Sequence, residues 1–459
     1  MISKSVAESV LACAMSGGAD FVELFGEITR NNSIFMIDGK IDRVNDTLIS
    51  GVGIRAFLGT RTVFASTTDT SREGLMKCAR AVAVAMGEVK QDISITLRDR
   101  MLPNLHPALI VPTGTDAAYR ADILRAGCFA AKEYDDAISQ VTGSLAGVDR
   151  RIWIANSDGL FTTDRHVRTR LGVSAVASAA GVNQSGSSSP GAGMGLEFFD
   201  RINPEDVGRE ASRQATVNLR ADYCPAGNMT VAIENGFGGV IFHEACGHSL
   251  EATSVSIGAS QMAGKLGETI ANPKVTAIDD GTIPSAWGSV NIDDEGTPTR
   301  RNVLIENGIL KNYLIDRLGS RRMGMPMTGS GRRQSYTFEA TSRMTNTFID
   351  NGTDRNEDII ASIENGLYCR KMGGGSVNPL TGEFNFAVTE GYLVKNGKIC
   401  EPVRGACLIG TGSEILRNID MVGQNLETAQ GMCGSSSGSV PTDVGQPLIR
   451  VSTITVGGR

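Results

Sequence analysis

Histidine, aromatic side chains and paired cysteines are scarce in this chain of 459 residues. It has four histidines, and aromatic residues make up 5% of it. The nine cysteines are scattered, their number is odd, and no two are spaced as Cys-x-x-Cys. A disulfide framework is therefore not expected. Because Glu8 also interrupts any apolar signal core at the start, the predicted location is the cytoplasm.

Long apolar runs and an excess of positive charge are also missing. No 18 consecutive residues are apolar, so no membrane-spanning segment is predicted. Lysine and arginine number 44 against 50 aspartates and glutamates, which gives a net charge of −6. A protein dedicated to nucleic acid normally carries a basic surface. Neither a membrane nor a nucleic acid is therefore an expected partner.

Glycine is abundant, with 55 residues, which predicts many turns in a strand-rich, α+β protein. Residues 1–222 are expected to form an α+β domain with a mostly antiparallel sheet. Asp38-Gly39 is typical of a hairpin turn, Thr70-x-x-Glu73 is typical of a helix-capping box, and the Gly/Ser-rich stretch 181–195 is expected to be a mobile loop. Hydrophobic periodicity predicts helices at 3–15, 70–86, 115–134 and 204–218, and strands at 20–28, 31–37, 48–57, 61–66, 138–146, 151–155 and 160–180.

The pattern changes after residue 222. Short alternating strands are separated by Asn-Gly pairs, as at Asn307-Gly308 and Asn396-Gly397. Residues 223–459 are therefore predicted to form a mainly antiparallel β domain, a curled sheet or partial barrel. One helix is expected to interrupt it and to carry a metal site.

That helix contains the segment HEACGH at 243–248, an H-E-x-x-x-H motif. Residues five apart on a straight α-helix point about 140° apart, so His243 and His248 could not bind one ion there. A π-bulge, in which backbone bonds run from i to i+5, brings them close to one face. Gly247 can absorb the distortion. A bulged or unwound helix is therefore predicted at 245–248.

The chemistry of the motif indicates a zinc site. Two imidazoles suit Zn²⁺, and Glu244 is placed to act as general base on a metal-activated water. A third protein ligand is required. Glu251, one turn after His248, is better placed to accept a hydrogen bond from that imidazole. The residues alone leave several other candidates for the third ligand open, namely Cys246, His166, Cys400, Cys407 and Cys433.

The sequence segments around the motif resemble those of the TldD/PmbA family of metallopeptidases. The similarity covers most of 228–458 in order, and the intact motif resembles the TldD side of the family. The matching stretches are HEACGHSLEA at 243–252, NIDDEGTP at 291–298, LIENGIL at 304–310, GSGRRQSY at 329–336, RMTNTFI at 343–349, PLTGEFNFAVTEGYLVKNGKICEPVRGACLIGTG at 379–412, GMCGSSSGSVPTDVGQP at 431–447 and TVGG at 455–458.

The resemblance implies a zinc peptidase with Glu244 as the catalytic base. Its metal would be held by His243, His248 and Cys433. It also implies a two-domain subunit, forming a homodimer or a heterodimer with a PmbA-like subunit. The substrates implied are small or unfolded peptides, admitted to an enclosed cleft.

Two other functions are weaker readings. The chain could be a non-catalytic subunit that binds peptides or stabilises a catalytic partner, but a structural zinc site has no use for Glu244. It could be a different metal enzyme, such as an iron hydrolase or oxygenase, but no 2-His-1-carboxylate arrangement is apparent.

Three further segments have both a functional and an ordinary structural interpretation. Gly373-Gly374-Gly375 is expected to be a loop near the cleft, because no Lys-Ser/Thr follows it as in a phosphate-binding loop. The acidic run at 293–295 is expected to be a solvated turn. Arg332 and Arg333 could clamp a peptide carboxylate or could be a surface or interface pair.

Overall fold

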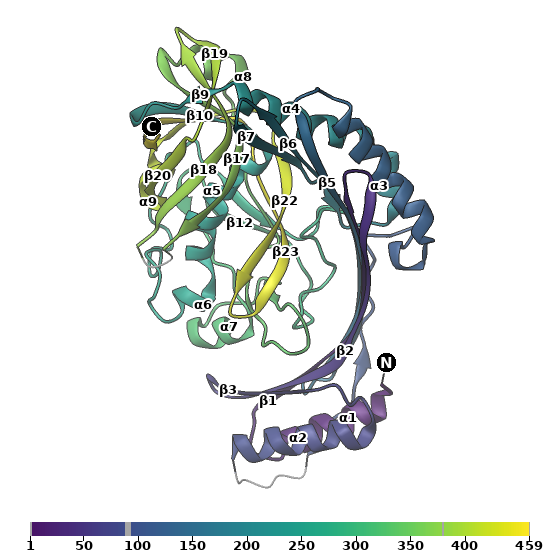
Figure 1. Ribbon diagram of the computed structural model, residues 1–459. Coiled ribbons are helices and arrows are strands. Elements are labelled where there is room, and N and C mark those ends of the chain that lie inside the picture. The colour runs from purple at the N-terminus through teal and green to yellow at the C-terminus, as the bar shows by residue number, and fades with distance from the viewer. Residues whose placement is uncertain (1, 88–92, 379–380, 459) are drawn as a thin grey trace.

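The computed structural model describes residues 2–87, 93–378 and 381–458. It is 24% helix and 44% strand, with mostly antiparallel sheets, so the predicted α+β class is confirmed. The first half builds one long curved sheet, and the second half forms a β-rich body inside its curve (Figure 1). The division into domains at residue 222 stays a prediction. No helix in the described ranges is long and apolar enough to cross a membrane.

The long sheet has the strand order β3-β2-β1-β5-β6-β4, with β7 and β8 also paired to β6. Asp38 and Gly39 connect its first two strands, with φ of 46° and 78°. These left-handed angles are those of a tight hairpin turn, so the predicted hairpin is confirmed. The strands are β1 (Phe21–Ile37), β2 (Lys40–Leu58), β3 (Arg61–Thr67), β4 (Arg98–Asp99), β5 (Ile138–Asn156), β6 (Leu160–Ala179), β7 (Val182–Ser188) and β8 (Gly191–Ala192).

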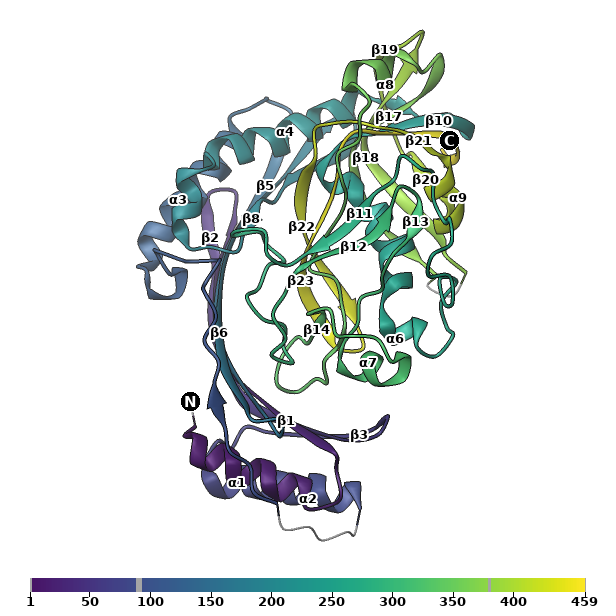
Figure 2. The same ribbon diagram turned by 180° about the vertical axis from the view of Figure 1, so that it is seen from behind.

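Two pairs of helices cover the outer face of this sheet at its opposite ends (Figures 1 and 2). Each pair buries an apolar stripe against the strands and so forms a core of its own. Ser71, and not Thr70, caps the second helix, because its Oγ accepts from the Gly74 N–H at 3.1 Å. The predicted capping box is therefore wrong, although the helix is present. The helices are α1 (Lys4–Met15), α2 (Arg72–Met86), α3 (Ala117–Lys132) and α4 (Pro204–Arg220).

The stretch 181–195 is not a mobile loop, and that prediction is wrong. Most of it forms β7 and β8, which pair with β6. Backbone hydrogen bonds make this pairing, so it does not require apolar side chains, and glycine and serine residues are sufficient. The Gln214 side chain of α4 also accepts from the Ser187 N–H at 2.9 Å.

The inner body contains a closed ring of strands. β17, β10, β24, β20 and β18 pair in sequence, and β18 pairs back to β17, which confirms the predicted partial barrel. Gly373–375 are not a loop but lie in β17, where its register with β18 shifts. The strands of this sheet are β9 (Asp222–Tyr223), β10 (Gly227–Ile233), β17 (Asn365–Val377), β18 (Glu383–Lys395), β19 (Lys398–Arg404), β20 (Cys407–Thr411), β21 (Ile419–Val422) and β24 (Ile449–Gly457).

A second sheet of the body has the order β13-β12-β11-β16-β23-β22 and ends in a long hairpin (Figure 2). Its strands are β11 (Ala277–Asp280), β12 (Arg301–Glu306), β13 (Ile309–Leu310), β16 (Asn346–Ile349), β22 (Glu427–Ser435) and β23 (Gly438–Gln446). The sequence predicted one helix in this half, whereas several short ones are present. Besides the motif segment described below, they are α6 (Ala252–Val255), α7 (Arg317–Met323), α8 (Asn356–Ala361) and α9 (Gly412–Asn418), and a small ribbon is formed by β14 (Gly331–Arg332) and β15 (Thr341–Ser342).

Charged side chains join the inner face of the long sheet to the body. Arg333 donates to Glu23 at 2.7 Å, and Arg55 lies between Glu23 and Glu295. All four side chains are at most 2% exposed. Burial raises the pKa of Glu23, but Arg55 and Arg333 outweigh it and lower that pKa overall.

The acidic run at 293–295 lies in this contact, so the predicted solvated turn is wrong. Backbone N–H groups take the place of water around its carboxylates. Asp293 accepts from the amides of Glu295, Thr297 and Gly331, and Asp294 accepts from the Arg333 amide.

Candidate metal centre

The H-E-x-x-x-H motif forms an irregular helical segment. A 3₁₀ turn (Gly236–Gly239) leads into α5 (Val240–Phe242), then a π-helical turn (His243–Gly247) and another 3₁₀ turn (His248–Leu250). The wide turn holds the extra residue of the motif, which brings the two histidines onto one face. The predicted bulge is therefore confirmed, beginning two residues earlier than expected.

Gly247 ends the wide turn beneath Met344. A Cβ on Gly247 would lie 2.4 Å from the Met344 sulfur, so the buried Met344 side chain would have to shift to admit any other residue. The glycine thus allows the Met344 side chain to pack closely against the turn.

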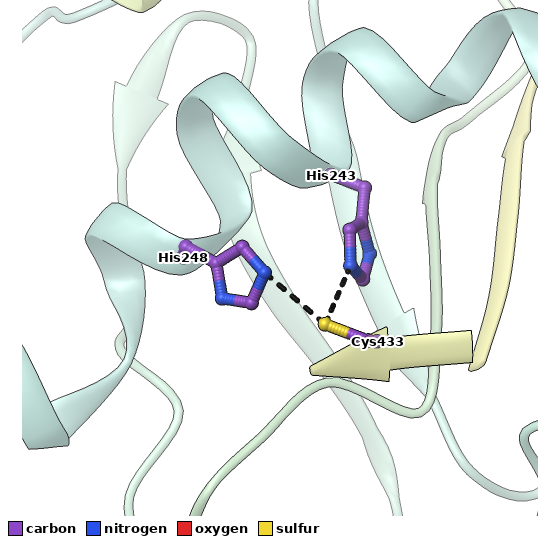
Figure 3. Close-up of side chains that lie close together, drawn as sticks. All are labelled: His243, His248 and Cys433. Atoms are coloured by element: carbon purple, nitrogen blue, oxygen red, sulfur yellow. Dashed lines mark hydrogen bonds between the residues drawn. The ribbon is translucent and has the colours of Figure 1, made fainter. Parts of the chain in front are cut away.

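His243, His248 and Cys433 converge on one point (Figure 3). Cys433 Sγ lies 3.2 Å from His243 Nε2 and 3.1 Å from His248 Nε2, and the three donor atoms lie within 4.8 Å of one another. Tetrahedral zinc with ordinary bond lengths separates a nitrogen and a sulfur ligand by roughly 3.5 Å. The donor set and its spacing therefore fit zinc after a small outward movement.

Cys433 reaches the histidines from the β22–β23 hairpin, and Arg343 holds that hairpin in place. The buried guanidinium of Arg343 donates to the carbonyls of Cys433 and Gly438 and to Ser437 Oγ. Its Nε lies 3.8 Å from Glu251 Oε1. Sequence reasoning missed Arg343, and its only signal was its place in the family-like stretch at 343–349.

Glu251 contacts the second histidine, which lies one turn before it on the same segment. His248 Nδ1 lies 3.1 Å from Glu251 Oε2, which leaves Nε2 facing Cys433. Burial lowers the pKa of His248, but Glu251 and Cys433 outweigh it and raise that pKa well above its ordinary value. Burial, with His248 and Arg343 nearby, holds the pKa of His243 well below its ordinary value, so this imidazole is neutral.

Glu244 is the most exposed residue around the cluster. Its Oε2 lies 3.6 Å from His248 Nε2, and its side chain is 32% exposed, against 14% for that of His248. His243 and Cys433 are buried. A carboxylate in this position can reach both solvent and a group held by the cluster.

The other candidates for the third ligand lie elsewhere. Cys246 faces the Gly412 carbonyl, and His166 contacts Asp164 in the long sheet. Cys400 and Cys407 lie in β19 and β20.

Arg332 and Arg333 are also outside the cluster. Both are buried, so their interpretation as a surface pair is wrong. Arg332 donates to the carbonyls of Met344 and Pro441, whereas Arg333 pairs with Glu23.

Three domain profiles of one family match the chain. They are described as PmbA/TldA metallopeptidase domain 1 (residues 22–85), central domain (111–219) and C-terminal domain (226–458).

Three similar proteins are named metalloproteases, and two of them match this chain along nearly their whole length. A Haemophilus influenzae protein named metalloprotease TldD homolog is 37% identical over 96% of this chain and 93% of its own. A metalloprotease of Methanothermobacter thermautotrophicus is 32% identical over 96% of each chain. A Saccharolobus solfataricus relative, 31% identical over 57% of this chain and 58% of its own, is named zinc metalloprotease TldD homolog.

Solved structures share the fold. A putative modulator of DNA gyrase from Thermotoga maritima has a TM-score of 0.81 at 23% identity, covering 99% of this chain and 100% of its own. TldE from Thermococcus kodakarensis has a TM-score of 0.77 at 19% identity, with the same coverage. From the domain profiles and the full-length relatives, this chain belongs to the TldD/PmbA family of metallopeptidases.

Proposed function

We propose that this chain is a zinc-dependent peptidase in which His243, His248 and Cys433 hold the metal and Glu244 is the general base. The convergence of two imidazole nitrogens and one thiol beside a partly exposed carboxylate carries this proposal. The family name of the relatives supports peptidase chemistry in general. The Saccharolobus solfataricus name supports zinc.

Bound zinc would supply Lewis-acid activation of a water molecule and of the peptide carbonyl. The residues of the chain would perform the remaining steps. Glu244 takes a proton from the attacking water and returns it to the nitrogen of the leaving amine. Glu251 holds His248 with Nε2 turned inward, and Arg343 holds the Cys433 backbone.

The proposed substrates are short or unfolded peptides. His243 and Cys433 are 2% and 5% exposed, so the cluster lies below the surface, and Glu244 is its most exposed residue. A flexible chain can thread to such a position, whereas the surface of a folded protein cannot.

The decisive experiment compares wild type with Glu244→Gln. Metal content is measured by elemental analysis, and hydrolysis is measured on an unstructured peptide mixture. We expect one zinc per chain in both proteins, and a loss of turnover of about 10²–10⁴-fold in the variant. Full activity of Glu244→Gln would remove Glu244 from the mechanism.

A cysteine pair gives the matched control for the metal ligands. Cys433→Ala should lose zinc, whereas Cys246→Ala, three residues from His243 but facing the Gly412 carbonyl, should retain it. Zinc retained by Cys433→Ala and lost by Cys246→Ala would assign the third ligand to Cys246.

We further propose that the chain works in the cytoplasm as a homodimer or with a PmbA-like subunit. TldE shares its fold, which supports a related partner. Molar mass by light scattering tests the homodimer, since a monomer active alone would contradict both assemblies. The alternative function, a non-catalytic subunit that binds peptides or stabilises a catalytic partner, predicts no hydrolysis by the chain alone. With a catalytic partner added, it predicts hydrolysis that Glu244→Gln does not change.

A further inference from the structure

A cavity of about 380 Å³ lies between the inner face of the long sheet and the β22–β23 hairpin. β1, β2, β5 and β6 contribute one side, and the hairpin contributes the other side together with the body segments 287–294 and 332–334. Much of its lining is apolar, including Ile49, Val148, Trp287, Val290, Ile292 and Met432. A space of this size and character suits a medium-sized apolar side chain.

Two buried arginines of this cavity have no carboxylate within ion-pair distance among the described residues. Arg168 donates from Nε to the Trp287 carbonyl at 2.8 Å and from Nη2 to the Ser289 carbonyl at 3.4 Å. Arg332 donates to two further carbonyls. Both side chains are 4% exposed. A buried guanidinium is costly without an anion, so the pair favours an anionic ligand.

The electrostatics of the pair agree with this view. Burial, together with Arg332 and Arg150, lowers the pKa of Arg168 to about 9. Burial also lowers the pKa of Arg332 to about 10, with Arg343 and Arg150 opposing its charge and Asp294 and Asp279 favouring it.

The carboxylates that line the cavity are already engaged. Glu27 accepts from the Tyr336 amide and from Thr29 Oγ1, at 2.9 and 2.6 Å. Asp293 and Asp294 accept from backbone amides, as described above. Arg150 Nε lies 3.5 Å from Glu27 Oε1, and Arg150 Nη1 lies 3.4 Å from Asp294 Oδ1. These two acids are therefore already paired with an arginine.

His166 supplies an unused hydrogen-bond acceptor at the same wall. Its Nε2 lies 3.0 Å from Asp164 Oδ2, and its Nδ1 is buried with no partner in the described structure. Burial lowers the pKa of His166, which keeps the ring neutral. With a proton on Nε2 facing Asp164, Nδ1 carries a lone pair that can accept from an N–H group.

The cavity adjoins the hairpin that carries Cys433. Met432 and Val440 line it; Met432 precedes Cys433 directly, and Val440 is the pairing partner of Cys433. Met432 also borders a larger cleft of about 1140 Å³ along 427–432. The cavity and the metal cluster therefore flank the same hairpin.

We infer that this cavity binds the free carboxylate end of a peptide whose last side chain is apolar. Arg168 and Arg332 receive the carboxylate, His166 Nδ1 accepts the last amide N–H, and the apolar wall receives the side chain. This inference rests on the proposed peptidase function for the identity of the ligand. It adds that the enzyme selects peptides by a free C-terminus.

Calorimetry on the full-length protein tests the inference without hydrolysis. The probes are N-acetyl-L-leucine and its amide, which differ only in the carboxylate. We expect the acid to bind wild type at least tenfold more tightly than the amide. Arg168→Gln should weaken binding of the acid at least tenfold. Arg165→Gln is the matched control, because Arg165 lies on the same strand but pairs with Asp149 outside the cavity.

Other outcomes overturn the assignment. Equal binding of acid and amide by wild type would exclude a carboxylate site, and this comparison does not depend on whether a variant folds. Equal binding of N-acetyl-L-glutamic acid α-amide, whose only carboxylate is on the side chain, would assign the site to an internal acidic residue instead. If inorganic phosphate bound as tightly as N-acetyl-L-leucine, the cavity would be a general anion site.

The two proposals fail separately. Selective binding of the acid by a protein that hydrolyses no peptide would leave the cavity assignment intact and reject the peptidase. Peptide hydrolysis by a protein that binds the acid and the amide equally would support the peptidase and reject the cavity assignment. When both hold, Arg168→Gln should raise KM for peptides with a free C-terminus and leave zinc content and the KM of amidated peptides unchanged.

Discussion

Arg343 connects the parts of the metal cluster that lie far apart in the sequence. One fully buried guanidinium contacts the backbone of Cys433, the hairpin turn at Ser437–Gly438 and the carboxylate that orients His248. Groups that fix metal ligands in this way commonly change metal affinity by 10–100-fold when removed. Arg343 is therefore a positioning residue for the proposed zinc site.

Arg343→Met should weaken zinc binding by about 10–100-fold. Competition with a chromogenic chelator measures this affinity directly. The control is Arg301→Met, since Arg301 pairs with Asp350 at the surface, and its zinc affinity should equal that of wild type. Equal affinities for Arg343→Met and wild type would reduce Arg343 to a packing role.

The buried carboxyl group of Asp279 predicts how the stability of the protein depends on pH. It accepts from the Thr345 amide and from the hydroxyls of Thr345 and Thr347, yet burial outweighs these bonds and raises its pKa to about 6. The folded protein therefore holds this proton more tightly than the unfolded chain does. The resulting stabilisation is complete below about pH 4 and is lost as pH rises through about 6.

Asp279→Asn should remove this component of the pH profile. Between pH 4 and pH 7 the free energy of unfolding of wild type should fall, relative to that of the variant, by about 1–3 kcal/mol. Urea unfolding at several pH values provides the comparison. Parallel profiles for the two proteins would show that Asp279 ionises at its ordinary pKa.

The π-helical turn shows which elements can be read from sequence. Its geometry followed from the five-residue spacing of the histidines and from Gly247, both of which are local. The third member of the cluster could not be found in this way, because Cys433 comes from a hairpin 185 residues after His248. Resemblance to a family singled it out, and the residues alone did not.

The wrong predictions for residues 293–295 and 181–195 also come from contacts that the local sequence does not reveal. The acidic run at 293–295 looks like a surface turn until the long sheet covers it, and β7 lacks the apolar residues that mark a strand because its backbone makes the contacts. Arg55 of the long sheet lies 240 residues before Glu295, and β7 is held by backbone bonds to the neighbouring strand β6, so neither contact leaves a pattern of side chains in the local sequence.

Gly247→Ala tests the close contact beneath the wide turn. The new methyl group would lie 2.4 Å from the Met344 sulfur, so we expect a loss of about 1–3 kcal/mol of stability and weaker zinc binding. Thermal unfolding and chelator competition measure the two effects. Gly434→Ala, beside Cys433 but with open space around the new Cβ, should show neither effect.

The whole molecule depends on a buried ionic contact between the long sheet and the inner body. Breaking such a pair leaves an uncompensated charge in the interior, which typically costs about 3–5 kcal/mol. Sequence analysis could not predict this contact, because Glu23 and Arg333 are 310 residues apart.

Arg333→Met should therefore lower the free energy of unfolding, but by less than the roughly 3–5 kcal/mol of a fully broken pair, because Arg55 still lies 3.2 Å from Glu23. Chemical denaturation provides the measurement, and Lys395→Met, which removes an exposed ion pair with Glu401, should leave stability unchanged. If Glu23→Gln combined with Arg333→Met is as unstable as Arg333→Met alone, the cost does not come from the stranded Glu23 charge.

The long sheet also has a mechanical consequence. Between the α1–α2 pair and the α3–α4 pair, no α-helix of the described chain covers the outer face (Figure 1). The body holds the inner face of this stretch instead, because Arg168 donates to the Trp287 and Ser289 carbonyls and Arg150 lies 3.4 Å from Asp294. The middle of the sheet is therefore stiffened from its concave side, so the curve of the sheet depends on the body that it encloses.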